Sequence, residues 1–262
     1  MIVEEIMSRD PLYVEESTFL TKARQLIRDN HVRGLPVLDT QGHVKGIVTN
    51  QDMLRVTSTK SNVTVAGFIV GAPLVTRDVN IFDAARLMLP QKSMILPVVE
   101  SAENAKLIGV VSLLDIFRGM DLEKVPERQI SEVMTKKVVT ATPDEPVSKV
   151  WENMIDSDFT GLPVLDEKGE PMGMITRFDI LKRGFARISR EDDGKTKEGT
   201  KLHIGKIMST PIYSIRPEDT LRTAFEAMKK NDIGRIAVVD NGKLVGIVDR
   251  YDLIKSYLGD RR

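Results

Sequence analysis

The stretch Gly46–Asp52, GIVTNQD, is followed by three variants of itself in this chain. They read GVVSLLD at Gly109–Asp115, GMITRFD at Gly173–Asp179 and GIVDRYD at Gly246–Asp252. Each copy has a glycine, two apolar residues that suit a strand, a hydroxyl or acidic residue, and an aspartate that opens a segment with helical spacing. Each copy therefore predicts a strand end, a polar turn and a helix start, where unpaired backbone N–H groups can bind an anion.

A second phrase precedes each copy in nearly the same register. It reads GLPVLD from Gly34, ILPVVE from Ile95, GLPVLD from Gly161 and RIAVVD from Arg235. Most of the connections between the two phrases hold Gly or Asn, as expected of hairpins. Upstream of each hairpin come an extended segment and an amphipathic stretch, so each unit reads strand, helix, strand, strand, helix. Two phrases in fixed order, repeated along the chain, indicate internal repeats.

The spacing of apolar residues is clearest in the fourth unit. There Pro217 and Asp219 precede an apolar set with the three-and-four spacing of one helical face. That set is Leu221, Ala224, Phe225 and Met228.

A unit of about sixty residues with one three-stranded sheet cannot bury both faces alone, so neighbouring units are expected to pair. The predicted repeats 1 to 4 are residues 3–57, 64–120, 129–184 and 203–258, and the predicted pairs are residues 1–122 and 123–262. The polar stretch Ser189–Lys201 is expected to be a solvated linker between repeats 3 and 4.

Composition excludes several classes of function. The 262 residues carry 38 Lys plus Arg and 38 Asp plus Glu, so no net field attracts nucleic acid or anionic lipid. No apolar run approaches the length of a membrane span, and the start of the chain does not resemble a secretory signal, so a cytoplasmic location is expected. The absence of cysteine excludes thiolate metal sites and a cysteine nucleophile, and the three histidines are scattered, so no metal site is predicted.

With both phrases in view, the chain resembles a protein built of four CBS domains, that is, two tandem Bateman modules, over nearly its whole length. Its layout is similar to that of the gamma subunit of AMP-activated protein kinase. The resemblance implies an α+β fold of four β-α-β-β-α repeats, paired into two modules in a disc-like arrangement around bound adenine nucleotides.

The resemblance also implies which residues of the recurring stretch bind a ligand. The aspartate would bind ribose hydroxyls, and the Thr or Ser three residues earlier would contact phosphate, which suits the chemistry of both groups. The simpler alternative is that each aspartate only caps its helix. The candidates are Thr49, Asp52, Ser112, Asp115, Thr176, Asp179 and Asp252. In the fourth copy Asp249 replaces the hydroxyl and would repel phosphate, so this site is expected to be empty or altered in specificity.

In the resembled family each ligand also touches strands of the partner repeat. A basic residue just before the second phrase often pairs with phosphate, and guanidinium suits this role because its donors match two oxygens. The predicted clefts combine Arg235 with Thr176 and Asp179, and Arg33 with Ser112 and Asp115. The cleft of Thr49 and Asp52 lacks such a residue and is expected to accept a nucleoside or a less charged ligand.

Other residues near the clefts have two interpretations each. Tyr13 and Tyr213 are candidates for contact with adenine, with plain core as the alternative. Arg177 and Arg250, in the first turn of their helices, face either phosphate or solvent, and solvent is the expectation.

Several functions are compatible with these features. The first is a non-catalytic regulatory module for energy sensing, which binds AMP, ADP or ATP and signals occupancy to a regulated protein in trans. The second is a sensor of another adenosyl ligand, such as S-adenosylmethionine or NAD. The third is an interaction or RNA-binding scaffold with vestigial clefts. An enzyme is not expected, because these phrases recur in every repeat whereas catalytic sets are usually unique. The nucleotide would be a ligand and not a catalytic cofactor, and the chain would be a monomer or a homodimer.

Overall fold

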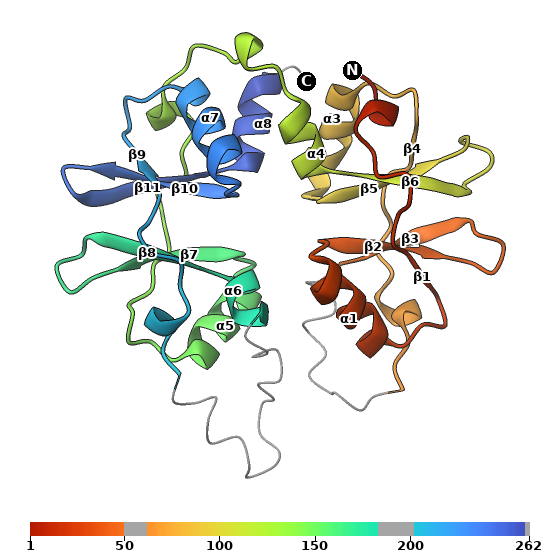
Figure 1. Ribbon diagram of the computed structural model, residues 1–262, viewed down its shortest axis with the longest axis horizontal. Helices are drawn as coiled ribbons and strands as arrows, with labels where there is room; N and C mark the ends of the chain where they lie inside the picture. Colours follow the sequence, from red (N-terminus) through yellow and green to blue (C-terminus); the bar gives the residue numbers. More distant parts are fainter. Residues whose placement is uncertain (50–61, 183–201, 260–262) are drawn as a thin grey trace. The chain divides into compact units, whose positions relative to one another are not determined.

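The computed structural model describes residues 1–49, 62–182 and 202–259. The chain divides into two compact units, Met1–Met120 (unit 1) and Asp121–Arg262 (unit 2). Each unit contains two of the predicted repeats, and each repeat has a small sheet with helices against it (Figure 1). The α+β fold of four repeats is therefore confirmed.

Unit 1 holds two three-stranded sheets, in the orders β1-β2-β3 and β4-β5-β6. In each sheet the first strand pairs in parallel with the second, and the second and third form an antiparallel hairpin. The elements of repeat 1 are β1 (Val14–Glu15), α1 (Leu20–Asn30), β2 (Gly34–Leu38) and β3 (Val44–Thr49). Those of repeat 2 are β4 (Val75–Thr76), α3 (Ile81–Gln91), β5 (Ile95–Val99), β6 (Leu107–Ser112) and α4 (Leu113–Gly119). The helix expected after Asp52 lies outside the described residues.

Unit 2 follows the same plan. Repeat 3 comprises α5 (Val147–Asp156), β7 (Gly161–Leu165), β8 (Pro171–Thr176) and α6 (Arg177–Lys182). Repeat 4 comprises β9 (Ser214–Ile215), α7 (Leu221–Asn231), β10 (Arg235–Asp240), β11 (Lys243–Asp249) and α8 (Arg250–Leu258). The expected first strand of repeat 3 is reduced to one parallel bridge, between Ala141 and Val164, so β7 and β8 form a two-stranded sheet. Five short 3-10 turns complete the described elements: η1 (Val3–Glu5), η2 (Val65–Phe68), η3 (Leu122–Lys124), η4 (Ile130–Glu132) and η7 (Ile204–Lys206).

Within each unit the two sheets lie between outer helices (Figure 1). This position explains why every residue of β2 and of β5 is buried, since a strand covered on both faces has no polar side. The helices turn one apolar face inward. In α7 the predicted set Leu221, Ala224, Phe225 and Met228 is fully buried, which confirms that pattern. The cap of α7 is Thr220, whose hydroxyl accepts a hydrogen bond from the Thr223 amide.

The two repeats of a unit exchange the segments that lead into them. In unit 1 the segment before repeat 1 bonds to β6, where the Ser8 amide donates to the Val110 carbonyl at 2.9 Å. The segment before repeat 2 bonds to β3 in return, where the Val70 amide donates to the Ile47 carbonyl at 2.9 Å. Unit 2 repeats the exchange with bridges from Thr135 to Ile247 and from Ser209 to Met174. Each repeat is thus completed by its partner.

The glycine that opens each recurring stretch makes this exchange possible. A Cβ on Gly46 would lie 2.5 Å from the Val70 carbonyl oxygen, and one on Gly109 would lie 2.8 Å from that of Ser8. On Gly173 it would lie 2.9 Å from the Ser209 carbonyl oxygen. No side chain fits at these positions, so the glycines are required for packing rather than for contact with a ligand.

Candidate functional site

The hydroxyl and carboxylate of the recurring stretch meet at the end of the hairpin, in the same way in repeats 2 and 3. In repeat 3 the Thr176 hydroxyl donates to Asp179 Oδ2 at 2.6 Å, and the Thr176 amide donates to the same oxygen at 2.8 Å. The Asp179 amide donates back to the Thr176 hydroxyl at 3.2 Å. Ser112 and Asp115 make the corresponding bonds at 2.6, 2.8 and 3.2 Å.

These bonds form a capping box, so Asp115 and Asp179 do cap their helices, as the simpler interpretation expected. The cap engages only Oδ2 of each carboxylate. Within the described residues, Oδ1 of Asp115 and of Asp179 makes no hydrogen bond. One oxygen of each aspartate is therefore available to accept a hydrogen bond from a ligand.

Repeat 4 builds the same box from two carboxylates. Asp249 Oδ1 accepts from the amides of Tyr251 and Asp252 at 2.9 and 3.1 Å, and Asp252 Oδ2 accepts from the Asp249 amide at 3.0 Å. Burial, together with the charge of Asp249, raises the pKa of Asp252 to about 7. Lys255 opposes this shift. An anion at this box would meet a carboxylate in place of a hydroxyl.

The Asp252 carboxyl should make the stability of unit 2 depend on pH. Its pKa is about 7 in the fold and near 4 in an unfolded chain. The folded state holds the Asp252 proton more tightly than the unfolded chain does. The stabilisation of unit 2 by this proton is therefore fully present below about pH 4 and is lost as the pH rises through about 7. Asp249→Asn keeps the cap acceptor and removes the neighbouring charge. It should reduce the loss of stability between about pH 5 and about pH 8 by roughly 1 kcal/mol, measured by urea unfolding. An equal pH dependence in the variant and the wild type would contradict the role of Asp249.

The box of repeat 1 is described only in part. Thr49 ends β3 and pairs with Gly34, while Asp52 lies outside the described residues. The strand-pairing register of the hairpin is nevertheless the same in all four repeats. In each one, the first residue of the hairpin lies opposite the residue at the hydroxyl position. The opposed pairs are Gly34 with Thr49, Ile95 with Ser112, Gly161 with Thr176 and Arg235 with Asp249.

Arg235 reaches from repeat 4 to repeat 3. Its Nη2 donates to the Thr160 hydroxyl, and its guanidinium lies over Gly161. Gly161 in turn is the residue opposite Thr176. The structure thus brings Arg235 to the hairpin that carries the Thr176 and Asp179 box. Thr160 is not predicted as a site residue, because nothing in its immediate sequence indicates a partner 75 residues away.

Arg33 has a different environment. Its side chain is exposed, and it makes no hydrogen bond or ion pair in the part of the chain that the structure describes. Arg33 therefore makes no hydrogen bond or ion pair with Ser112 or Asp115. The neighbouring Gly34 faces the side chain of Ile95, whose Cδ1 would lie 3.3 Å from a Cβ at that glycine.

Tyr13 and Tyr213 are surface residues, so the alternative interpretation, that they belong to the core, is wrong. Each is 51% exposed, just before the first strand of its repeat. Leu12 and Val139 at related positions are 37% and 41% exposed. Large apolar side chains thus remain uncovered beside the first strands of repeats 1, 3 and 4.

Arg177 and Arg250 do not face solvent, contrary to expectation. Arg177 is 7% exposed. Its Nη2 donates to the Met154 carbonyl and lies 3.5 Å from Asp158 Oδ1. Burial lowers the pKa of Arg177, and Asp158 opposes that shift. Arg250 pairs likewise with Asp232 at 3.4 Å. Both arginines tie the start of the last helix of their repeat to the turn before its hairpin.

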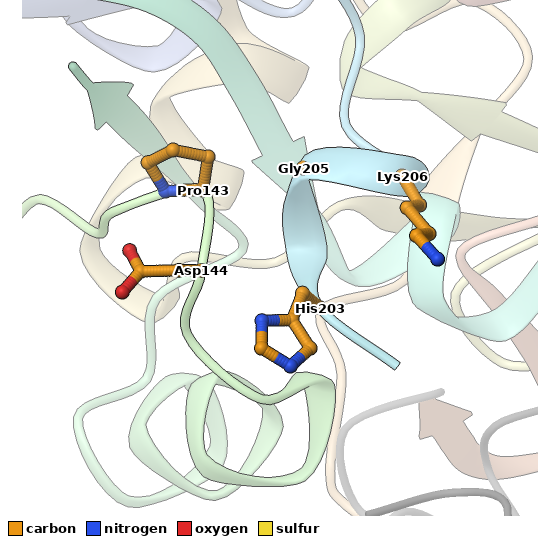
Figure 2. A pocket seen from close by; sticks show the side chains of 5 residues that line it. All are labelled: Pro143, Asp144, His203, Gly205 and Lys206. Carbon is orange, nitrogen blue, oxygen red and sulfur yellow. The ribbon is translucent and has the colours of Figure 1, made fainter. Parts of the chain in front are cut away.

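A surface hollow of about 470 Å³ lies elsewhere in unit 2, lined by Pro143, Asp144, His203, Gly205 and Lys206 (Figure 2). None of the predicted site residues lines it. A hydrogen bond from the Thr142 hydroxyl holds the pKa of Asp144 below its usual value.

Within residues 1–49, 62–182 and 202–259, no cluster of His, Asp and Glu is suited to hold a metal ion. The same residues contain no helix long and apolar enough to cross a membrane.

Comparison with known proteins agrees with the repeat pattern. The CBS domain profile matches residues 3–58, 71–121, 130–185 and 204–259. The chain is 27% identical to the uncharacterized protein MJ1225 of Methanocaldococcus jannaschii, over 93% of this chain and 94% of that protein. The crystal structure of MJ1225, described as a candidate archaeal homologue of g-AMPK, superposes with a TM-score of 0.80 at 26% identity, covering 98% of this chain and 100% of that one.

Other relatives match over a smaller share of their length. The uncharacterized protein MJ1404 of the same organism is 28% identical over 98% of this chain, but the chain spans only 62% of that protein. Homoserine O-acetyltransferase of Methanohalobium evestigatum is 39% identical over 41% of this chain, which corresponds to 21% of the enzyme. The similarity to this enzyme is therefore confined to a minor part of it.

Proposed function

Because the chain belongs to the CBS-domain family, we propose that it is a non-catalytic regulatory module that binds an adenine nucleotide at the Thr176 and Asp179 box of unit 2. The single observation that carries the proposal is the cross-repeat reach of Arg235. A hydroxyl, a carboxylate oxygen without a hydrogen bond and a guanidinium converge on one hairpin. This set matches the hydroxyls of a ribose and the oxygens of a phosphate.

Each group has a distinct role in the proposed complex. Asp179 Oδ1 accepts from the ribose hydroxyls, while Oδ2 keeps its place in the cap. Arg235 pairs with the phosphate, since a planar guanidinium matches two phosphate oxygens at once. Tyr213, exposed beside the first strand of repeat 4, supplies an aromatic surface for the adenine ring. Ser112 and Asp115 form a second such site in unit 1, with Arg33 recruited from its exposed position on binding.

Signalling requires only that the nucleotide binds two arrangements of the protein with different affinity. The exchanged segments supply a physical route, because each repeat is bonded to the segment that leads into its partner. A ligand that changes one hairpin thereby acts on both repeats of the unit. The regulated protein would read that change in trans, as an energy-sensing or nucleotide-sensing subunit does.

Calorimetric titration tests the proposal. The protein, stripped of nucleotides, is titrated in parallel with AMP, ATP and S-adenosylmethionine. We expect saturable binding of AMP or ATP with a Kd at or below about 100 μM, equivalent to roughly 5.5 kcal/mol of binding free energy. Binding of S-adenosylmethionine alone would change the ligand, and no heat with any of the three would leave the scaffold function as the better explanation.

A further inference from the structure

The contact between Arg235 and repeat 3 has two parts that a surface arginine would not need. The Thr160 hydroxyl accepts from Nη2. Gly161 leaves the space in which the guanidinium lies, since a Cβ there would be 3.1 Å from Cζ and closer still to Nη1. The backbone of Gly161 does not otherwise demand glycine, because its φ lies outside the left-handed region. The guanidinium is the group nearest to that Cβ, and the Ile175 carbonyl oxygen, 3.2 Å away, also limits the space for a side chain.

Unit 1 has the same geometry with different chemistry. There Gly34 occupies the place of Gly161, and the residue that faces it from the partner repeat is Ile95, with Cδ1 3.3 Å from a Cβ at Gly34. An apolar side chain replaces the guanidinium. The residue before the hairpin of repeat 3 is Thr160, and in repeat 1 it is Arg33, whose side chain is exposed. The two units therefore place opposite kinds of side chain at one equivalent position.

We propose that Thr160 and Gly161 are positioning residues that fix the guanidinium of Arg235 at the repeat 3 box, and that this cross-repeat contact makes unit 2 select ligands with a 5′-phosphate over the corresponding nucleosides. This inference rests on the proposed nucleotide site and adds its selectivity. A guanidinium on an unrestrained side chain loses rotamer entropy when it binds phosphate. The Thr160 hydroxyl removes part of that cost in advance, because it already holds one edge of the planar group.

The argument gives different expectations for AMP and adenosine. Adenosine has the same ribose and base but no phosphate, so its binding does not use Arg235. Loss of the Thr160 hydroxyl should therefore weaken AMP and leave adenosine unchanged. A residue needed only for the fold would weaken both ligands equally.

The test is calorimetry of the full chain with AMP and adenosine. The unit 2 site is identified as the one whose binding disappears in Asp179→Asn. Thr160→Val, which keeps the shape of the side chain, should lower the AMP affinity of that site about tenfold, and Thr160→Ser should restore it. Gly161→Ala should have a similar effect, since its methyl group displaces the end of a flexible side chain. Adenosine affinity should change less than twofold in all three variants.

A double-mutant cycle completes the test. In an Arg235→Ala background, Thr160→Val should have no further effect on AMP, because the group that it positions is gone. Equal effects of Thr160→Val with and without Arg235, or equal losses of AMP and adenosine, would overturn this inference and leave the nucleotide site intact. No AMP binding to the wild-type protein would overturn the proposed function and the inference with it.

Discussion

The double variant Asp179→Ala with Arg235→Ala is expected to lose AMP binding at unit 2 and to keep its fold. The two side chains supply the charged groups of the proposed site: the carboxylate for ribose and the guanidinium for phosphate. Hydrogen bonds to charged groups contribute about 1.5 to 3 kcal/mol each, so the joint loss corresponds to a reduction in affinity of roughly a hundredfold to ten-thousandfold. Calorimetry would record this as one fewer AMP site per chain.

The control for this variant is Asp156→Ala with Arg222→Ala, also in unit 2. It makes the same change of charge at two exposed side chains away from the box, and it should leave the number of AMP sites unchanged. Asp179→Ala also removes a helix cap, which costs about 1 kcal/mol of stability, so Asp179→Asn with Arg235→Ala separates binding from folding. An unchanged stoichiometry in both double variants would show that the nucleotide binds elsewhere.

The repeats and their secondary structure could be predicted because the information is local. The glycine, the apolar pair and the aspartate lie within seven residues, and the helix and hairpin patterns lie within a few more. The sequence does not indicate the role of the opening glycine. That role, to admit the exchanged segment, depends on Val70 against Gly46 or Ser8 against Gly109. Those contacts join different repeats, and no pattern within one repeat indicates them.

The arginines show the same limit in the candidate site. Arg177 and Arg250 were expected in solvent because a charged residue in the first helical turn is usually exposed. Each is instead paired with an aspartate in a left-handed conformation, at φ 57° for Asp158 and 48° for Asp232. Burial of an arginine is favourable only when its carboxylate partner is already held in place. Each arginine is separated from its aspartate by 18 or 19 residues, so the local sequence does not indicate the pair.

Arg235 is predicted to face the neighbouring repeat, and its hydrogen bond to Thr160 lies in that repeat. The assignment came from the register that all repeats share, together with the crossed clefts that the family resemblance implied. The alignment of the repeats is visible in the sequence as a fixed spacing. The contact with Thr160 is visible only in the structure. Positions set by spacing could thus be predicted, and contacts set by packing between repeats could not.

Gly46→Ala is expected to destabilise unit 1 by about 3 kcal/mol or more, the largest effect on stability that we predict. The new Cβ would lie 2.5 Å from the Val70 carbonyl oxygen and 2.6 Å from Ile69 Cγ2. Gly46 also has φ +153°, which side chains rarely adopt. Relief of the collision would move Val70 away from β3 and break the pair of 2.9 Å hydrogen bonds between Ile47 and Val70. Urea unfolding of the full chain would measure the loss.

Gly67→Ala provides the matched control, because it adds the same methyl group in the same unit where no atom lies within 4 Å and φ is ordinary. It should change the free energy of unfolding by less than about 0.5 kcal/mol. The comparison separates two roles for the recurring glycine. If it served a ligand, Gly46→Ala would be as stable as Gly67→Ala and would lose only binding. If it admits the exchanged segment, stability falls in the absence of any ligand, because the segment that completes repeat 1 belongs to its partner.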